Sequence, residues 1–264
     1  MSSVYRYRFP ILALTVVVAG LVWDAAAAII NKPNAIASMA SPAGTLHNFE
    51  QMVNNPGVHN LVFNGLAITM EAIFEGFAIA AVIGIPVGFL MGRYILVDRF
   101  LDPWVNAWYS IPAVAFVPLV MPWFGQSYTA TMFIAFLIAA FSIIINVYTG
   151  VKNVSKSLVE PGLSFGASGT QMMSKVIVPA ALPDIMVALR MGITRAIDGV
   201  IIAEMIFTVG GFGGVIFDAA DKLELDLAFA CIIILAVISI TVNEVMKYLN
   251  RRVVSWKESA AMSR

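Results

Sequence analysis

Charge is scarce in this sequence. Asp, Glu, Lys and Arg make up 12% of the 264 residues, against about 25% in soluble domains. Hydrophobic residues make up 60%, and the mean hydropathy is +0.87. A water-soluble domain cannot hide so much apolar surface, because folding leaves a large share of any chain exposed. The composition excludes a disordered chain, a disulfide scaffold and nearly all soluble enzymes, and indicates that lipid surrounds much of the chain.

Groups that recognise nucleic acids or metals are also few. The 16 basic and 16 acidic residues cancel to a formal net charge of zero, so the chain has no electrostatic footprint for nucleic acid. The one cysteine, Cys231, lies in an apolar run and is interpreted as a small core residue. His47 and His59 are interpreted as solvated loop residues, because no cysteine or spaced carboxylate pair accompanies them. We therefore expect no metal site.

Six segments are long and apolar enough to cross a bilayer, which takes about 20 mostly apolar residues. They predict an all-α membrane protein with six transmembrane helices, built as a single domain over residues 1–264. The predicted spans are Phe9–Ile30, Leu61–Met91, Trp104–Phe124, Tyr128–Thr149, Pro183–Val209 and Leu227–Leu249.

The basic residues orient these spans. If the N-terminus is cytoplasmic, the opposite side holds only Lys32 and Lys222. This positive-inside bias predicts that both termini lie in the cytoplasm. Residues 1–8 then form a cytoplasmic N-terminus, 31–60 an outer loop, 150–182 a cytoplasmic loop and 250–264 a cytoplasmic tail. The cytoplasmic basic residues are Arg6, Arg8, Arg93, Arg99, Lys152, Lys156, Lys175, Lys247, Arg251, Arg252, Lys257 and Arg264.

The first apolar segment has a second interpretation. Arg6 and Arg8 precede the apolar run from Phe9 to Trp23, and four alanines at 25–28 offer a small-residue cleavage site. Together these features are typical of a signal peptide. We favour a retained span, because the apolar run continues through Ile30.

Small residues and prolines mark the second and third spans. Gly84, Gly88 and Gly92 repeat every four residues, so they share one helix face and predict close packing against another helix. Prolines break helical hydrogen bonding, and such helices occur where neighbouring protein or a water-filled path satisfies the freed carbonyls. This feature points to transport. The prolines of the third span are Pro112, Pro118 and Pro122.

Two acidic residues lie near the start of the second span. Glu71 and Glu75 are four residues apart and share a helix face. They belong either to an interfacial lead-in helix or to a polar cavity, where they would contribute to a substrate path.

Residues 150–182 form the longest cytoplasmic connection, and they are too apolar for a plain linker. Between Ser155 and Lys175 we predict two short helices separated around Gly166, with an apolar docking surface for a soluble partner. The alternative is an amphipathic segment that lies on the membrane. Only Lys156 and Lys175 flank it, which makes electrostatic attraction to lipid weak.

The spacing in this segment resembles the signature of permeases from binding-protein-dependent ABC importers. That signature is E-A-A, three residues, G, nine residues, then I-x-L-P. Glu160, Gly166 and Pro179 match it by identity, whereas Pro161 and Gly162 replace the two alanines. A larger part of the chain, about residues 60 to 250, resembles the nitrate, taurine and alkanesulfonate branch. The segments that carry this likeness include Gly84-Ile85-Pro86-Val87-Gly88, Trp123-Phe124-Gly125, Ser164-Phe165-Gly166-Ala167-Ser168, Pro179-Ala180-Ala181-Leu182-Pro183 and Ala203-Glu204-Met205.

The resemblance implies the type I importer fold in the bacterial inner membrane. In that family two permease copies pair, two ATPase subunits bind beneath them, and an extracytoplasmic binding protein delivers the solute. The permease itself is not catalytic and binds no cofactor, since ATP and Mg²⁺ belong to the ATPase; no G-x-x-x-x-G-K-[ST] motif occurs here. Residues 150–182 become the coupling loop, which inserts a helix into the ATPase. The expected coupling residues are Glu160, Gly162, Phe165, Gly166, Ala167 and Pro179.

Charges inside the fifth span are the remaining candidates, because ionisable groups in lipid are costly. Arg195 and Asp198 are three residues apart and can pair on one helix face. They either line the substrate path or form an internal ion pair that locks the helices. Arg190 needs another partner. Glu204 matches a position of the family, and we interpret it as structural, at the outer gate.

The glycines between Gly210 and Gly214 predict a flexible turn into a short outer helix rather than a nucleotide loop, because they follow a membrane helix. The acidic residues that come next are interpreted as a solvated face, with docking of a binding protein as the alternative. They are Asp218, Asp221, Glu224 and Asp226.

The predicted function is the membrane subunit of an ATP-driven importer for a small anionic solute, such as nitrate, a sulfonate or an aromatic carboxylate. A pyrimidine-type vitamin precursor is the alternative solute. The alternative functions are an intramembrane enzyme, for which no H-E-x-x-H motif is present, and an ion-driven secondary transporter, for which no internal repeat is detectable.

Overall fold

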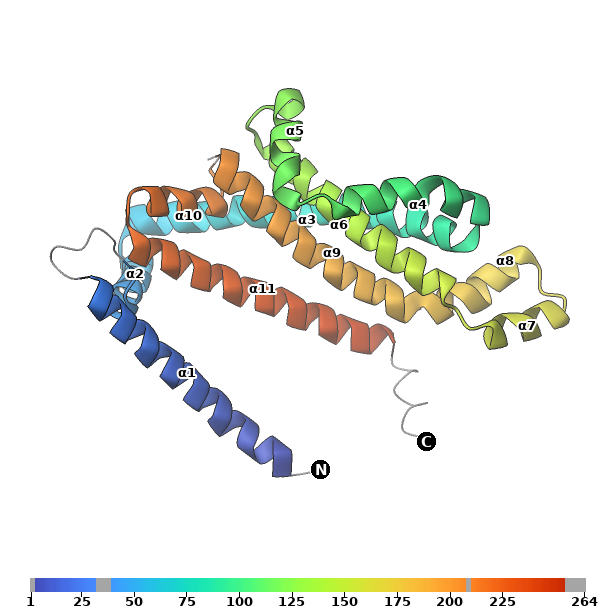
Figure 1. Cartoon of the computed structure of the whole chain (residues 1–264), viewed down its shortest axis with the longest axis horizontal. Helices are drawn as coiled ribbons and strands as arrows, with labels where there is room; N and C mark the ends of the chain where they lie inside the picture. Colours follow the sequence, from blue (N-terminus) through green and yellow to red (C-terminus); the bar gives the residue numbers. More distant parts are fainter. Residues whose placement is uncertain (1–2, 32–38, 208–209, 255–264) are drawn as a thin grey trace.

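The computed structural model describes residues 3–31, 39–207 and 210–254, with side chains from residue 14 on. Within these ranges the chain forms helices and no strand. In Figure 1, α7 and α8 lie beyond one end of the long helices, and α2 and α10 lie at the other end. The elements are α1 (Ser3–Ile30), α2 (Pro42–Asn54), α3 (Pro56–Arg93), α4 (Ile95–Ser110), η1 (Ala113–Ala115), α5 (Phe116–Phe124), α6 (Tyr128–Lys152), α7 (Lys156–Ser164), α8 (Gly169–Met172), η2 (Met173–Ile177), α9 (Val178–Phe207), α10 (Phe212–Asp221) and α11 (Leu225–Val253).

The long helices confirm the predicted all-α membrane fold. Among the described residues, four helical segments are long and apolar enough to span a bilayer, and α4 with α5 makes a fifth as a bent pair. These five cover the second to sixth predicted spans. Helix α1 covers the first predicted span, and its described apolar part is Leu14–Ile30. The four unbroken segments are Pro56–Arg93, Tyr128–Lys152, Gly169–Phe207 and Leu225–Val253.

The core forms where α3, α6 and α9 pack together. The glycine face of α3 lies directly against α6. A Cβ at Gly88 would lie 2.5 Å from the Ile144 carbonyl oxygen, and one at Gly84 would lie 3.0 Å from Ile143. Small residues allow this close approach, which in lipid strengthens van der Waals packing between helices. Gly92 continues the same face against Val151.

Helix α11 lies at the edge of this core. In the most apolar 18 residues of α11 only 17% of the stretch is buried, compared with 56% in the most apolar 18 residues of α6. Cys231 is nevertheless buried, in a cluster with Phe212 and Val62. The interpretation of this thiol as a small core residue is therefore confirmed.

The third predicted span, Trp104–Phe124, is interrupted, as its prolines indicated, and forms part of a bent pair of helices. Helix α4 ends at Ser110, and the following helical segment runs at 95° to it. The break occurs at Pro112, because proline has no N–H and restricts the residue before it to extended conformations. Ile111 accordingly has φ −73° and ψ 130°.

Helices occupy most of the predicted outer connection at 31–60, namely α2 and the first turns of α3. Each helix begins at a proline after a capping residue. The Ser41 hydroxyl accepts from the Gly44 N–H at 3.0 Å, and the Asn55 side chain accepts from the Gly57 N–H at 3.0 Å. Asp226 accepts from the Ser41 N–H at 2.7 Å and so ties α2 to α11.

Both histidines therefore lie on helices rather than in a loop. His47 is on α2, and His59 is on α3, where its ring stacks on Phe63 with the ring centroids 4.4 Å apart. Residues 32–38 of the predicted outer loop lie outside the described residues.

The fifth span begins earlier than the predicted Pro183. The helix is continuous from Gly169, through one π turn at 173–177, to Phe207. The π turn widens the helix where the ring of Pro179 would meet the carbonyl of Lys175, so the proline is accommodated. The predicted end at Val209 and residues 255–264 of the predicted tail lie outside the described residues.

The predicted turn into a short outer helix is confirmed. Gly210 has a positive φ of 39°, and α10 begins at Phe212. Its residues Phe212 to Ile216 are buried against α3 and α11.

Candidate functional site

Helix α7 of the coupling loop ends in a turn that favours glycine. Gly166 has φ +71°, in the left-handed region. Its N–H donates to the Leu163 carbonyl at 3.0 Å, and the Ala167 N–H donates to the Gly162 carbonyl at 3.0 Å. These two bonds make a Schellman motif, which satisfies the last carbonyls of the helix and reverses the chain. Two helices therefore meet around Gly166 as predicted, but the second continues into α9 instead of stopping near Lys175.

The coupling loop has an apolar tip on a packed base. Phe165 is 91% exposed and Leu163 is 60% exposed. At the base, a Cβ at Gly162 would lie 2.6 Å from the Met172 Cε, and Met172 is buried. Ser168 caps α8 in a capping box. The loop thus presents exposed apolar side chains on a preformed frame, which is the form of a docking surface.

The other expected coupling residues lie on both sides of this tip. Glu160 is exposed on α7, and Pro179 is exposed in the first turn of α9. Ala167 is half-buried and packs against the core of α3, α6 and α9. Ala167 and Met172 therefore connect the tip to this core by packing.

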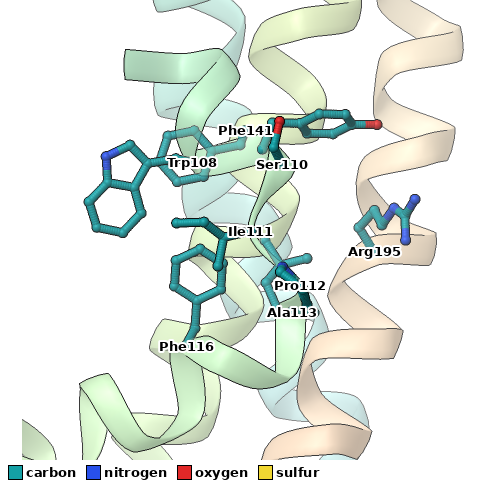
Figure 2. Close-up of a pocket in the computed structure, with 10 residues that line it drawn as sticks. Trp108, Ser110, Ile111, Pro112, Ala113, Phe116, Phe141 and Arg195 are labelled. Carbon is teal, nitrogen blue, oxygen red and sulfur yellow. The ribbon is translucent and has the colours of Figure 1, made fainter. Parts of the chain in front are cut away.

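A cavity of about 260 Å³ lies beside the break between α4 and η1. Figure 2 shows the rings of Trp108, Phe116 and Phe141 on one side of the bend and Arg195 of α9 on the other. The Trp108 ring stacks on Phe116 and Phe141 with centroid separations of 5.7 and 5.9 Å. The cavity therefore combines an aromatic wall with one cation.

A second cavity, of about 570 Å³, shares Tyr109 and Arg195 with the first. The predicted ion pair lines it, with Arg195 Nη1 and Asp198 Oδ2 3.6 Å apart. Both side chains are about half exposed, at 51% and 47%. Arg195 thus pairs with Asp198 and also lines both cavities. The two alternatives for Arg195, a place on the substrate path and an internal ion pair, therefore do not exclude each other. The other residues lining this cavity are Arg190, Met191, Thr194, Asn243 and Lys247.

Glu71 and Glu75 do not join Arg195 and Asp198. Both are exposed on the continuous helix α3, and neither is among the residues that line the two cavities. Glu75 accepts a hydrogen bond from the Tyr128 hydroxyl at 2.8 Å, which connects α3 to the start of α6. They therefore lie on α3 itself and not beside the Arg195 cavities.

Glu204 is buried and holds the turn that follows α9. Its carboxylate accepts from the Thr69 hydroxyl at 2.7 Å and from the Gly213 N–H at 2.8 Å. The Thr69 oxygen in turn accepts from the Phe212 N–H at 2.8 Å. These bonds join α3, α9 and α10 at the end of the molecule opposite the coupling loop.

We expect Thr69→Val to destabilise this junction. Valine keeps the shape but leaves the buried Phe212 N–H and one partner of Glu204 unsatisfied, which costs about 1–3 kcal/mol. The melting temperature of the purified chain in detergent should fall by roughly 3–10 °C. Thr241→Val is the matched control, because the Thr241 hydroxyl is exposed and donates to the Val237 carbonyl within α11 itself. Equal melting temperatures for the two variants would contradict the assigned role.

Sequence reasoning missed several cavity residues. Tyr109 comes from α4, whereas Asn243 and Lys247 come from α11. Asn243 and Lys247 are four residues apart and lie on the same face of α11, which lines the cavity. Two polar residues on one face of an apolar span are the sequence pattern that could have indicated this site.

Comparisons with known proteins show the family of the chain. Residues 84–255 match the family described as "binding-protein-dependent transport system inner membrane component". The chain is 32% identical over 240 residues to an ABC transporter permease protein of Methanocaldococcus jannaschii, covering 90% of this chain and 88% of that one. It is 31% identical over 191 residues to the taurine transport system permease of Escherichia coli, covering 72% and 70%.

Two further likenesses bear on the fold and on the range of solutes. A riboflavin transport system permease of Chloroflexus aurantiacus is 28% identical over 261 residues, covering 98% of this chain and 95% of that one. Among solved structures, an inward-facing methionine ABC transporter superposes with a TM-score of 0.67 at 20% identity, over 75% of this chain and 99% of that one. At this identity the superposition supports the fold alone.

Proposed function

Because this chain belongs to the family of binding-protein-dependent transport system inner membrane components, we propose that it forms the path by which a small anionic solute enters the cell through an ATP-driven importer. The observation that carries the proposal is Arg195, which faces a cavity at the broken span. Broken helices at such cavities are a recurrent form of transport site.

Charge around the second cavity supports an anion over a cation. Arg190, Arg195 and Lys247 line it, against the single lining carboxylate of Asp198. Glu244, next to the cavity, pairs with Lys247. The taurine permease of Escherichia coli and an aliphatic sulfonate permease of Bacillus subtilis, each 31% identical, carry names that fit organic sulfonates.

A second candidate solute is a flat, neutral ring compound. The stacked rings of Trp108, Phe116 and Phe141 favour it, because aromatic walls bind ring faces by offset stacking. The similarity to a riboflavin permease agrees with this alternative. The two candidates differ in their need for Arg195.

The family also implies the partners. We propose that the exposed tip with Leu163 and Phe165 docks on a separate ATPase subunit, which binds ATP and Mg²⁺, so that this chain is non-catalytic. A second copy of the chain completes the path, and a solute-binding protein docks at the outer end near α2 and α10. The assembly then lies in the cytoplasmic membrane of a bacterium.

Native mass spectrometry tests the proposal. We expect the tagged chain, co-expressed with its neighbouring genes and gently extracted, to appear with two copies of itself and two of an ATPase. The mass of the subunit also shows whether residues 1–28 are retained. A lone chain or a homodimer, with the ATPase expressed but unbound, would argue for the enzyme or secondary-transporter alternatives.

A further inference from the structure

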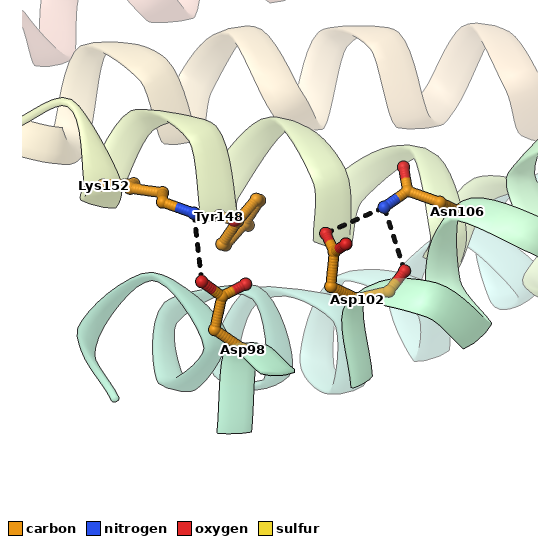
Figure 3. Close-up of polar contacts among 5 residues, drawn as sticks. All are labelled: Asp98, Asp102, Asn106, Tyr148 and Lys152. Atoms are coloured by element: carbon orange, nitrogen blue, oxygen red, sulfur yellow. Dashed lines mark hydrogen bonds and ion pairs between the residues drawn. The ribbon is translucent and has the colours of Figure 1, made fainter. Parts of the chain in front are cut away.

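We propose that the ion pair between Asp98 and Lys152 is a positioning contact that makes α4 follow the coupling loop, so that ATPase movement reaches the wall of the Arg195 cavity. The inference rests on the proposed function and adds a transmission route to it. Its starting point is the polar contact between α4 and α6 shown in Figure 3.

The pair is well formed and partly shielded. Lys152 Nζ lies 3.0 Å from Asp98 Oδ2, and the Asp98 side chain is only 12% exposed. Lys152 also contacts the Tyr148 hydroxyl and lies 4.5 Å from the centroid of the Tyr148 ring. A shielded carboxylate with a direct lysine partner holds its geometry more strongly than an exposed surface pair does.

The position of the pair in the chain gives it a mechanical role. Lys152 is the last residue of α6 and lies at the start of the segment 150–182. Asp98 lies in the first turn of α4, which runs without a break to Ser110. One helix therefore connects the ion pair at one end to the cavity at the other.

The far end of α4 forms the cavity wall. Trp108 stacks on Phe116 and Phe141 there, and Tyr109 and Ser110 also line the cavity. Between the two ends, α4 rests on α6 through apolar contacts, which are non-directional. Those contacts include Val105 of α4 and Ile144 of α6. The ion pair supplies the directional link near the loop, which makes α4 and the end of α6 move together.

The same helix carries a matched control. Asp102 lies one turn after Asp98. The Asn106 amide donates to the Asp102 carboxylate at 2.8 Å and to the Asp102 carbonyl at 2.9 Å, both within α4 (Figure 3). Replacement of Asp102 removes a carboxylate from α4 without breaking a contact to α6.

The test follows α4 directly and needs no transported solute. A cysteine replaces Ser110 in a Cys231→Ala background, and the complete transporter with its ATPase is reconstituted in nanodiscs. The rate of labelling by a water-soluble maleimide is measured without nucleotide and after trapping with ATP and vanadate. In this parent protein we expect trapping to change the rate at least fivefold.

Asp98→Asn and Lys152→Gln should each reduce the change in labelling rate on trapping to less than twofold. Both variants should still trap vanadate, which shows that the ATPase works. Asp102→Asn should keep the full change, and the exchange Asp98→Lys with Lys152→Asp should restore at least half of it. Native mass spectrometry of every variant reports assembly.

An unchanged response in Asp98→Asn and Lys152→Gln would overturn the inference. So would loss of assembly in both single variants, because the contact would then be structural. If the parent protein binds no ATPase, the proposed function itself fails, which distinguishes that failure from failure of the transmission route alone.

Discussion

Gly166→Asp is expected to abolish uptake while the chain still reaches the membrane. Gly166 holds φ +71° at the C-terminal end of α7, where a residue with a Cβ costs about 1–2 kcal/mol. A Cβ there would meet open space, so strain in the turn and a charge beside the apolar tip are the causes, not a clash. Solute uptake and chain abundance in isolated membranes are both measured in cells that carry the complete importer.

Two alanine variants separate the effect of backbone strain from the effect of the added charge. Gly166→Ala introduces strain without charge and should reduce uptake only severalfold. Gly169→Ala is the matched control, because Gly169 also faces open space and has no positive φ. It should behave as the parent protein does. Normal uptake in Gly166→Asp would remove the basis for assigning residues 150–182 to ATPase coupling.

Arg195→Gln is expected to lower uptake of an anionic solute at least tenfold. A charge-assisted hydrogen bond contributes about 1.5–3 kcal/mol, which corresponds to roughly 10- to 100-fold in binding. Taurine is the probe, because a permease similar to this chain is a taurine permease. Arg195→Lys keeps the charge but loses the planar fork of donors, so an intermediate rate is expected.

Riboflavin serves as the neutral probe in the same experiment. Its uptake should depend little on Arg195 and strongly on the aromatic wall, so Phe116→Ala is compared with Arg195→Gln. Arg251→Gln, exposed at the end of α11 and outside both cavities, is the matched charge control. If Arg195→Gln leaves transport of every accepted anion unchanged, Arg195 does not face the solute.

Structural features that are set by residues close together in the sequence could be predicted from the sequence alone. The long apolar runs predicted α3, α6 and α11 because lipid requires a minimum helix length. The four-residue spacing of Gly84, Gly88 and Gly92 predicted close packing, since residues four apart share a helix face. The distance from Glu160 to Gly166 predicted the turn of the coupling loop. Each of these signals lies within one helix or one loop.

Local signals misplaced some boundaries. Three prolines predicted an interrupted third span, but they did not show that Pro112 alone ends α4 and turns the chain by 95°. The fifth span was predicted to start at Pro183, whereas the helix begins earlier and a π turn at 173–177 accommodates Pro179. Proline weakens a helix locally, and the surrounding packing decides whether the helix continues.

Contacts between distant segments depended on how the helices pack. Thr69 and Glu204 are 135 residues apart in the sequence, and Asp98 and Lys152 are 54 apart. No spacing rule connects such residues, because the rotation and crossing of α3, α4, α6 and α9 decide which side chains meet. The chain alone thus specified a helical membrane subunit of the permease family and the turn at Gly166. Tertiary packing brought Arg195 to the aromatic bend of α4 and placed Glu71 and Glu75 away from it.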